Sequence, residues 1–190
     1  MQKDIGPVMG LYPTPVTVCG TVLEDGRVNW LTIAHVGVVE HGHLLVSIDA
    51  AHELSDAAIA ANGAVSVSLV TRDMIEAADW CGIAKAAKAD KSGAFAHRFD
   101  DVAGAPIIEC APLCMTCKVV DTLAVGNFHN YILEPVHTYV AEEYLTEKGK
   151  VDYAKMGPVL FEFSSGQYLA CGEIVGQCWR EGRDFEPQGA

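Results

Sequence analysis

The stretch "VNWLTIAHVG", residues 28 to 37, has the pattern of a β-strand yet carries three polar side chains. Asn29 stands near its start, Thr32 in its middle and His35 near its end. The preceding residues 14–23 alternate apolar with small polar side chains, which is the period of a strand with one buried face. "EDGR", residues 24 to 27, is a hairpin signal between the two segments. The pattern therefore predicts an antiparallel pair in which residues 28–39 form the return strand.

Further strands are predicted around two helices. Residues 43–49 and 64–70 are strand-like. Between them "ELSDAAIAANG" predicts a short helix, with Leu54, Ala58 and Ala61 on one face and an Asn-Gly stop. A capping-box-like start at Asp73 and Glu76 predicts a second helix over residues 74–87.

The rest of the chain is predicted as a loop followed by strands. Residues 88–104 are polar and contain glycine, which is typical of a surface loop. Strands follow at residues 115–126 and 130–145, with the turn at 126–129, and one more short strand lies within 158–176. Many strands and few helices predict a mainly β fold, a barrel with inserted helices, in a single domain over residues 1–190.

Composition excludes several classes of protein. The formal net charge of −12 disfavours nucleic acid and anionic membranes as partners, since both are bound by clustered Lys and Arg. No targeting segment or membrane-spanning run is visible, and the seven dispersed cysteines indicate reduced thiols, so we expect a soluble cytoplasmic protein. Hydrophobic residues make up 50% of the chain, which indicates an additional buried surface such as a subunit interface.

Five motifs follow one another along the chain: "YPTPVTVCGT", "DGRVNWLTIAH", "LLVSID", "ADWCGIAKAAKADK" and "CKVVDTLAVGNFHNYILEPV". In this order they resemble the flavin reductase-like family, and its flavoredoxin branch is the nearest match. The resemblance runs from about residue 12 to 176. It implies an FMN-binding split β-barrel with a few inserted helices, a homodimer, and flavin near the subunit boundary.

The resemblance also implies which residues contact the isoalloxazine ring. The strand after the first hairpin would lie against the ring, with Asn29 and Thr32 making polar contacts. An apolar ring with a polar edge suits a ribbon of mixed character. The alternative is that Asn29 only completes the turn and that Thr32 is an ordinary strand residue. The other implied ring contacts are Leu31, Ile33, Ala34 and Ser47.

At the phosphate end the sequence departs from the family. Where relatives offer an Arg, a Ser and a Thr, this chain has Ala50, His52 and Ser55. Ser55 keeps a hydroxyl near a helix start, where amides also favour phosphate. Loss of the Arg removes a bidentate contact that His52 would replace in part, unless His52 is simply a surface residue. Lys91 matches the family's loop lysine, which reaches the phosphate or ribityl region.

Two further departures concern catalysis. His35 stands where relatives carry a Trp, and Phe128 stands where they carry a His, with His129 one place later. A shift of one residue along a strand reverses the direction of the side chain, so His129 is expected to point away. His35 and His129 are the two candidates for a catalytic role.

The cluster "CAPLCMTC" raises the question of a metal site. Cys110, Cys114 and Cys117 have close spacing, but a zinc or iron–sulfur site requires a fourth ligand and a loop that folds around the metal. We expect no metal and interpret these residues as small apolar core residues.

The expected function is that of an FMN-dependent oxidoreductase fed by NAD(P)H or by a reduced redox protein. The sequence has no Gly-rich dinucleotide fingerprint, so a nicotinamide cofactor would bind openly against the flavin. Two alternatives stay open. One is a flavin-binding electron carrier without reductase turnover. The other is a split barrel that has lost flavin, which the residues at Ala50, His35 and Phe128 would favour.

Overall fold

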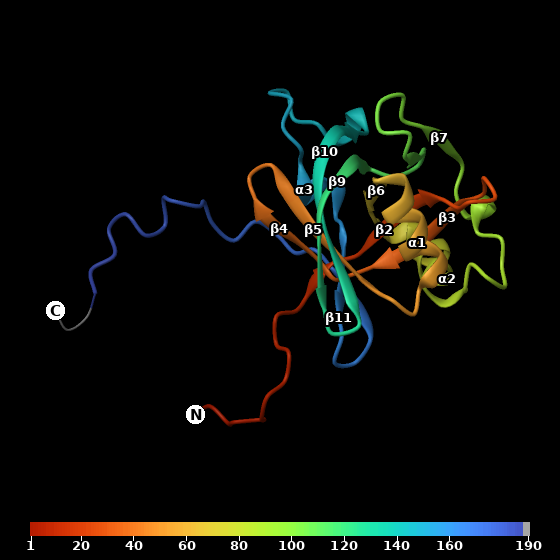
Figure 1. Ribbon diagram of the computed structural model, residues 1–190. Coiled ribbons are helices and arrows are strands. Elements are labelled where there is room, and N and C mark those ends of the chain that lie inside the picture. Colours follow the sequence, from red (N-terminus) through yellow and green to blue (C-terminus); the bar gives the residue numbers. More distant parts are fainter. Residues whose placement is uncertain (188–190) are drawn as a thin grey trace.

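The computed structural model describes residues 1–187 and is mainly β (Figure 1). Its helices are α1 (Glu53–Asn62), α2 (Ile75–Ile83) and α3 (Tyr153–Met156), with short 3₁₀ turns η1 (Arg72–Met74), η2 (Ser92–Ala94) and η3 (Glu142–Tyr144). Its strands are β1 (Thr14–Pro15), β2 (Thr17–Val22), β3 (Val28–Ile33), β4 (Val36–Glu40), β5 (His43–Asp49), β6 (Ala64–Leu69), β7 (His97–Phe99), β8 (Pro106–Ile108), β9 (Leu113–Val125), β10 (Phe128–Val140), β11 (Val159–Glu162) and β12 (Gln167–Ala170).

Seven strands form one antiparallel sheet in the order β3-β2-β6-β9-β10-β5-β4. The prediction of one continuous strand over residues 28–39 is wrong. The chain pairs with β2 as far as Ile33 and then, after Ala34 and His35, pairs with β5 as β4. The amide of Ser47 donates to the His35 carbonyl at 2.9 Å. Because β3 and β4 are the two edges of the sheet, this junction joins its edges, as a split barrel requires.

A second, three-stranded sheet of order β1-β11-β12 lies beside the barrel, and β7 pairs with β8. The C-terminal region therefore holds a hairpin of two strands, where the sequence predicts one strand. Thr14 lies opposite Phe161 in this sheet, which brings the first strand against a segment near the end of the chain.

Alternation along β3 divides the apolar core into two clusters. Trp30 is fully buried with Val18, Met74 and Phe95, while Leu31 faces the other cluster. Gly20, opposite Trp30 in β2, provides room for the indole, since a Cβ at Gly20 would come within 2.3 Å of the ring. A large side chain can occupy this position only because its partner has none.

The helices differ from prediction at their ends and faces. α1 has the predicted bounds, and the predicted packing face is right only at Ala58, which is buried. Leu54 is 42% exposed and Ala61 is exposed, and the other buried residues are Ser55 and Ile59. α2 ends at Ile83, before the predicted end at residue 87, because the backbone turns extended at Ala84.

The segment 88–104 is not a purely surface loop. It contains η2 and β7, and it buries Lys91, Phe95 and Asp100. The Asp100 carboxylate accepts hydrogen bonds from the amides of Val102 and Ala103. Three side chains also donate to it, those of Thr116, His137 and Tyr139. This buried carboxylate fixes the segment to β9 and β10.

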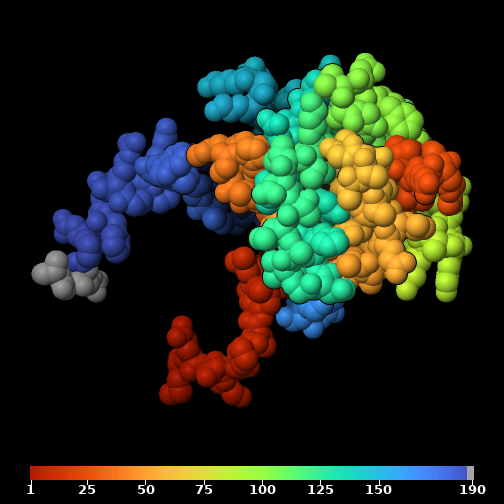
Figure 2. Space-filling view, viewed as in Figure 1, coloured from red at the N-terminus to blue at the C-terminus, as the bar shows by residue number. Residues whose placement is uncertain are grey.

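Both terminal segments leave the barrel on the same side, next to β4 (Figures 1 and 2). Residues 171–187 run outward without helix or strand. Among the residues described, no helix is long and apolar enough to cross a membrane.

Candidate functional site

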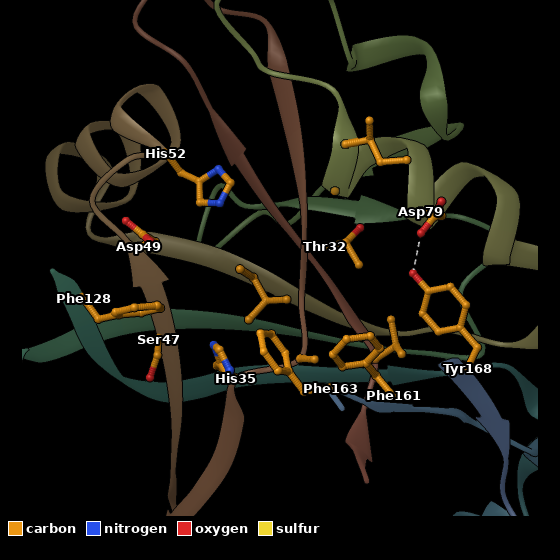
Figure 3. A pocket seen from close by; sticks show the side chains of 15 residues that line it. Thr32, His35, Ser47, Asp49, His52, Asp79, Phe128, Phe161, Phe163 and Tyr168 are labelled. Atoms are coloured by element: carbon orange, nitrogen blue, oxygen red, sulfur yellow. Dashed lines mark hydrogen bonds between the residues drawn. The ribbon is translucent and has the colours of Figure 1, made fainter. Parts of the chain in front are cut away.

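A cavity of about 440 Å³ lies at the C-terminal end of β3, between β5, α2 and the β11–β12 hairpin (Figure 3). Thr32 and Ile33 line it from β3, and Ala34 and His35 line it from the junction with β4. Ser47 reaches it from β5. The structure thus brings five of the predicted ring-contact and catalytic residues to one cavity.

One side of this cavity is formed where a glycine of α2, Gly82, lies against β3. A Cβ on Gly82 would meet the Thr32 Cβ at 3.4 Å, so helix and strand are already in contact. The Thr32 hydroxyl donates to the carbonyl of Ala78 in the same helix. Its proton is therefore engaged, and towards a ligand Thr32 can only accept a hydrogen bond.

Two predicted ring contacts, Asn29 and Leu31, do not line this cavity. Leu31 is 2% exposed and packs in the core. Asn29 is 1% exposed, and its Nδ2 donates to the Ser55 hydroxyl at 2.8 Å. Its Oδ1 has no hydrogen-bond partner. Asn29 therefore holds the first turn of α1 in place instead of facing the cavity.

A second cavity of about 200 Å³ opens at the N-terminus of α1 and shares His52 with the first. Ser55, Lys85 and Lys91 also line it. His52 is the N-cap residue of α1, but its side chain makes no capping hydrogen bond, so the first-turn amides keep their capacity for an outside acceptor. Burial lowers the pKa of His52, and the nearby charges of Lys91 and Lys85 lower it further. The lining holds two lysines and one carboxylate, Glu53, so in a chain of net charge −12 this corner has a net positive charge.

Lys91 is buried, although the sequence places it in a surface loop. It is 3% exposed, and its ammonium donates to the carbonyls of Trp30 at 3.1 Å and Cys81 at 2.8 Å. Burial lowers the pKa of Lys91. An ammonium group has three protons, so one stays available for an anion in the second cavity.

An aromatic wall faces β3 across the first cavity, and sequence reasoning missed the part of it that comes from the β11–β12 hairpin. Phe161, Phe163 and Tyr168 come from the β11–β12 hairpin, and Phe128 comes from β10. The Tyr168 hydroxyl donates to Asp79 at 2.6 Å, and burial followed by this hydrogen bond raises the pKa of Tyr168 to about 12. The available signal was the alternation in "LFEF", which puts two aromatic side chains on one strand face.

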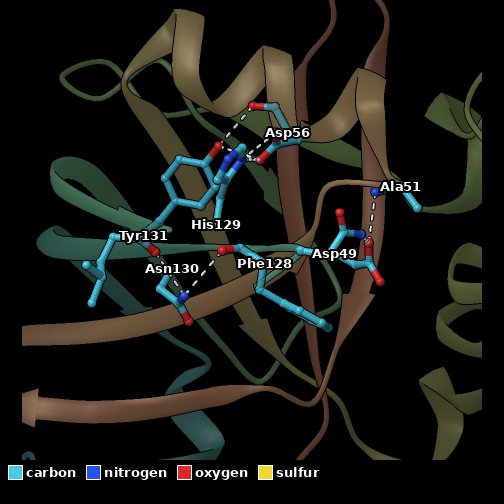
Figure 4. A network of polar contacts seen from close by, with 9 residues as sticks. Asp49, Ala51, Asp56, Phe128, His129, Asn130 and Tyr131 are labelled. Carbon is cyan, nitrogen blue, oxygen red and sulfur yellow. Dashed lines mark hydrogen bonds and ion pairs between the residues drawn. The ribbon is translucent and has the colours of Figure 1, made fainter. Parts of the chain in front are cut away.

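The two catalytic candidates lie in different places. His35 lines the cavity, with its ring 5.7 Å from that of Phe128, and its Nε2 is 3.1 Å from the Tyr12 hydroxyl. His129 faces away and pairs with Asp56 of α1 through Nδ1 at 2.7 Å (Figure 4). Tyr131 donates to the same carboxylate at 2.6 Å. This network fixes α1, with its cationic N-terminus, against β10.

The cysteines do not form a reactive centre in the part of the chain that the structure covers. Cys110 is exposed in a turn, while Cys114 and Cys117 are buried in β9. Burial raises the pKa of Cys117 and of neighbouring Cys19 to about 12, so these thiols stay protonated. Residues 1–187 contain no group of three or more His, Cys, Asp or Glu side chains arranged to hold a metal.

Comparison with known proteins gives a consistent picture. Residues 9–165 match the family model described as "Flavin reductase like domain". The structure is similar to flavoredoxin from Methanosarcina acetivorans (30% identity, TM-score 0.90, 96% of this chain and 98% of that chain). It is also similar to flavoredoxin of Desulfovibrio vulgaris (Miyazaki F) (27% identity, TM-score 0.88, 96% and 100%). An FMN-binding protein from Thermus thermophilus shares the fold (23% identity, TM-score 0.74, 93% and 98%). No curated protein matches.

Proposed function

This chain belongs to the flavin reductase-like family, and we propose that it is an FMN-binding oxidoreductase of the flavin reductase or flavoredoxin type. One observation carries the proposal. A cavity walled by β3, α2 and four aromatic side chains adjoins a smaller cavity, lined by two lysines, at an uncapped helix N-terminus, and His52 lines both. FMN has the same two parts, a planar ring system and a phosphate.

The larger cavity fits the ring. Ile33 and Ala34 offer apolar contact, and Thr32 accepts a hydrogen bond, which suits the one N–H of the flavin's pyrimidine edge. The Ser47 hydroxyl donates to Asn130 at 2.6 Å and can likewise accept. When bound, FMN supplies the electron chemistry at its ring, while these residues orient it and exclude water.

The smaller cavity fits the phosphate. Lys91, Ser55, His52 and the amides of α1 would hold it. Ala50 stands where the family resemblance implies an Arg at the phosphate end of the site. The buried ammonium of Lys91 offsets that loss in part, because a desolvated charge interacts more strongly with phosphate than an exposed one.

The electron donor is NAD(P)H or a reduced redox protein. Asp49 and Asp79 line the larger cavity, and their carboxylates repel the phosphates of a nicotinamide nucleotide. This favours a protein donor. It also supports the second candidate function, a flavin-binding electron carrier without reductase turnover.

A homodimer is part of the proposal. Val38 of β4 is 84% exposed, and Leu123 and Val125 of β9 are 61% and 58% exposed. β10 and β5 separate β9 from β4 in the sheet, but Val125 of β9 and Val36 of β4 line the same groove. Several exposed apolar side chains near one groove are typical of a surface that another subunit covers.

Three measurements test these points. An absorption spectrum of purified protein, before and after addition of FMN, should show a bound flavin, and a colourless protein that takes up no FMN would refute the proposal. Addition of NAD(P)H without air distinguishes the two candidate functions. Bleaching of the flavin absorption indicates a reductase, and an unchanged spectrum indicates an electron carrier. Light scattering at micromolar concentration should give the mass of a dimer.

A further inference from the structure

A groove of about 520 Å³ lies beside the flavin cavity, between the N-terminal segment and β4. Its apolar lining comes from Met9, Leu11, Tyr12, Val36, Leu45 and Val125. None of the described residues that line it is an Asp, Glu, Lys or Arg. Four polar residues, Thr14, His35, Ser47 and Asn130, complete the lining, so the groove suits an uncharged, bulky side chain that carries one polar group.

The C-terminal segment 171–187, called the tail below, carries side chains of that kind. Ile174 is 71% exposed, Val175 94%, Trp179 90% and Phe185 74%. Around Trp179 the tail forms turns, closed by hydrogen bonds such as that from the Arg180 amide to the Gln177 carbonyl at 3.1 Å. The indole of Trp179 is therefore exposed, and no residue among 1–187 covers it.

We propose that the tail of one protomer seats Trp179 in this groove on a second copy of the chain, and that the second copy returns the same contact. The inference rests on the homodimer of the proposed function and adds to it the segment that joins the two copies. Reciprocal exchange is the arrangement expected of a twofold dimer.

The direction of the tail supports a partner in trans. The tail and the N-terminal segment that borders the groove leave the barrel on the same side (Figures 1 and 2). Residues 171–178 reach at most about 28 Å when extended, enough to carry Trp179 onto an adjoining copy. The 90% exposure of Trp179 shows that it does not occupy the groove of its own chain.

The area agrees with a contribution to a dimer. An aromatic side chain buries about 150–250 Å², so Trp179 and Phe185 from two tails supply roughly 600–1,000 Å². Specific interfaces bury about 1,200–2,000 Å², and the exposed apolar side chains of β4 and β9 that border the groove can supply the remainder.

The seat has a consequence for the flavin site. Ala34, His35, Ser47 and Phe128 line both the groove and the larger cavity. A tail from the partner would therefore form the outer wall of the flavin cavity, and the site would be complete only in the dimer.

Cys178 precedes Trp179 and is exposed, which allows a cross-linking test. Two forms are made in a background with Cys110→Ser and Cys171→Ser. Form one carries Val125→Cys and Cys178→Ser, and form two keeps the native Cys178. After subunit exchange, a short bismaleimide should join form one to form two. The remaining four cysteines are buried and stay unreactive.

A matched control places the new cysteine at Val102, which is 60% exposed in the turn between β7 and β8, and it should give no more cross-linking than background. The proposal is overturned if a chain carrying both cysteines links only within itself, or if a dimer forms and gives no link. Trp179→Ala should weaken dimerisation by about 10- to 100-fold, as truncation of a buried interface aromatic does, whereas Val102→Ala should leave it unchanged.

Flavin content, read from visible absorption in the same samples, separates this inference from the proposed function. A monomer that retains FMN would overturn the tail exchange and the homodimer on which it rests, and would leave the flavin assignment standing. A cross-linked dimer that takes up no FMN would overturn the flavin assignment alone.

Discussion

Replacing Lys91 by Met tests its two proposed roles, stabilising the fold and binding the FMN phosphate. The variant keeps the buried aliphatic part of the side chain and removes the charge. The ammonium donates to the carbonyls of Trp30 and Cys81. A hydrogen bond from a charged group contributes about 1.5–3 kcal/mol, so two are worth about 3–6 kcal/mol. Removing the charge also removes the cost of burying it, which the lowered pKa of Lys91 reflects. The net loss in the free energy of unfolding of the flavin-free protein should be about 2–4 kcal/mol.

The same variant should discriminate between two flavins. If the third proton of Lys91 meets the phosphate, FMN should bind more weakly by about 1.5–3 kcal/mol, which is roughly 10- to 150-fold in Kd. Riboflavin has no phosphate, and its Kd should change by less than about threefold, the spread expected of a side chain that does not touch the ligand. Quenching of flavin fluorescence on titration, at a temperature where both proteins are folded, measures both constants.

Two comparators sharpen the assay. Lys85 lines the same small cavity but is exposed, so Lys85→Met should weaken FMN by less than about 1 kcal/mol without affecting stability. Lys88 is exposed and lines neither cavity, and Lys88→Met should do nothing. If Lys91→Met weakens both flavins equally, or lowers stability while FMN binds as before, Lys91 is a structural residue and the phosphate assignment is wrong.

Three further predictions concern the barrel. Burial alone would raise the pKa of Asp100, but hydrogen bonds from the Ala103 amide, Tyr139 and His137 outweigh it and hold the pKa well below its usual value. The stabilisation that this carboxylate provides should therefore be complete above about pH 4 and be lost as the pH falls further, and Asp100→Asn should cost about 2–4 kcal/mol in denaturant unfolding and flatten that acid dependence. Gly20→Ala should cost at least about 1–3 kcal/mol by the same assay, because its Cβ would overlap the Trp30 ring, and an unchanged midpoint would show that the core adjusts. Thiol titration of denatured protein without reductant should find all seven cysteines free, and stoichiometric zinc or iron by elemental analysis would contradict this.

Local pattern in the sequence was sufficient for most strands and for the bounds of α1. It failed where a long-range pairing decides the structure. Residues 28–39 read as one strand because the apolar pattern continues across Ala34 and His35. The change of partner strand there depends on β5, because the Ser47 amide donates a hydrogen bond to the His35 carbonyl. No pattern in residues 28–39 themselves indicates this long-range pairing.

The candidate site was predictable on one side only. Thr32, Ser55 and Lys91 follow from motifs that the family resemblance supplies, and all three line the two joined cavities. The opposite wall could not be inferred, because Phe161 reaches the site only through the pairing of β11 with β1. The burial of Lys91 was also hidden, since a lysine in a polar segment is normally solvated and only the tertiary fold supplies its two carbonyl partners.

The two departures from the family pattern at the proposed flavin cavity lie in contact with each other. His35 stands where a Trp is expected and Phe128 where a His is expected, and their rings meet edge to face at 5.7 Å. Residues in contact are coupled, so these positions are better treated as one exchange than as two losses. An aromatic ring and an imidazole are still paired in the wall of the cavity, but the imidazole has moved from β10 to the junction after β3. There it contacts the Tyr12 hydroxyl, while His129 is engaged by Asp56. If an imidazole takes part in the reaction of this protein, His35 is the candidate, because it lines the larger cavity and His129 does not.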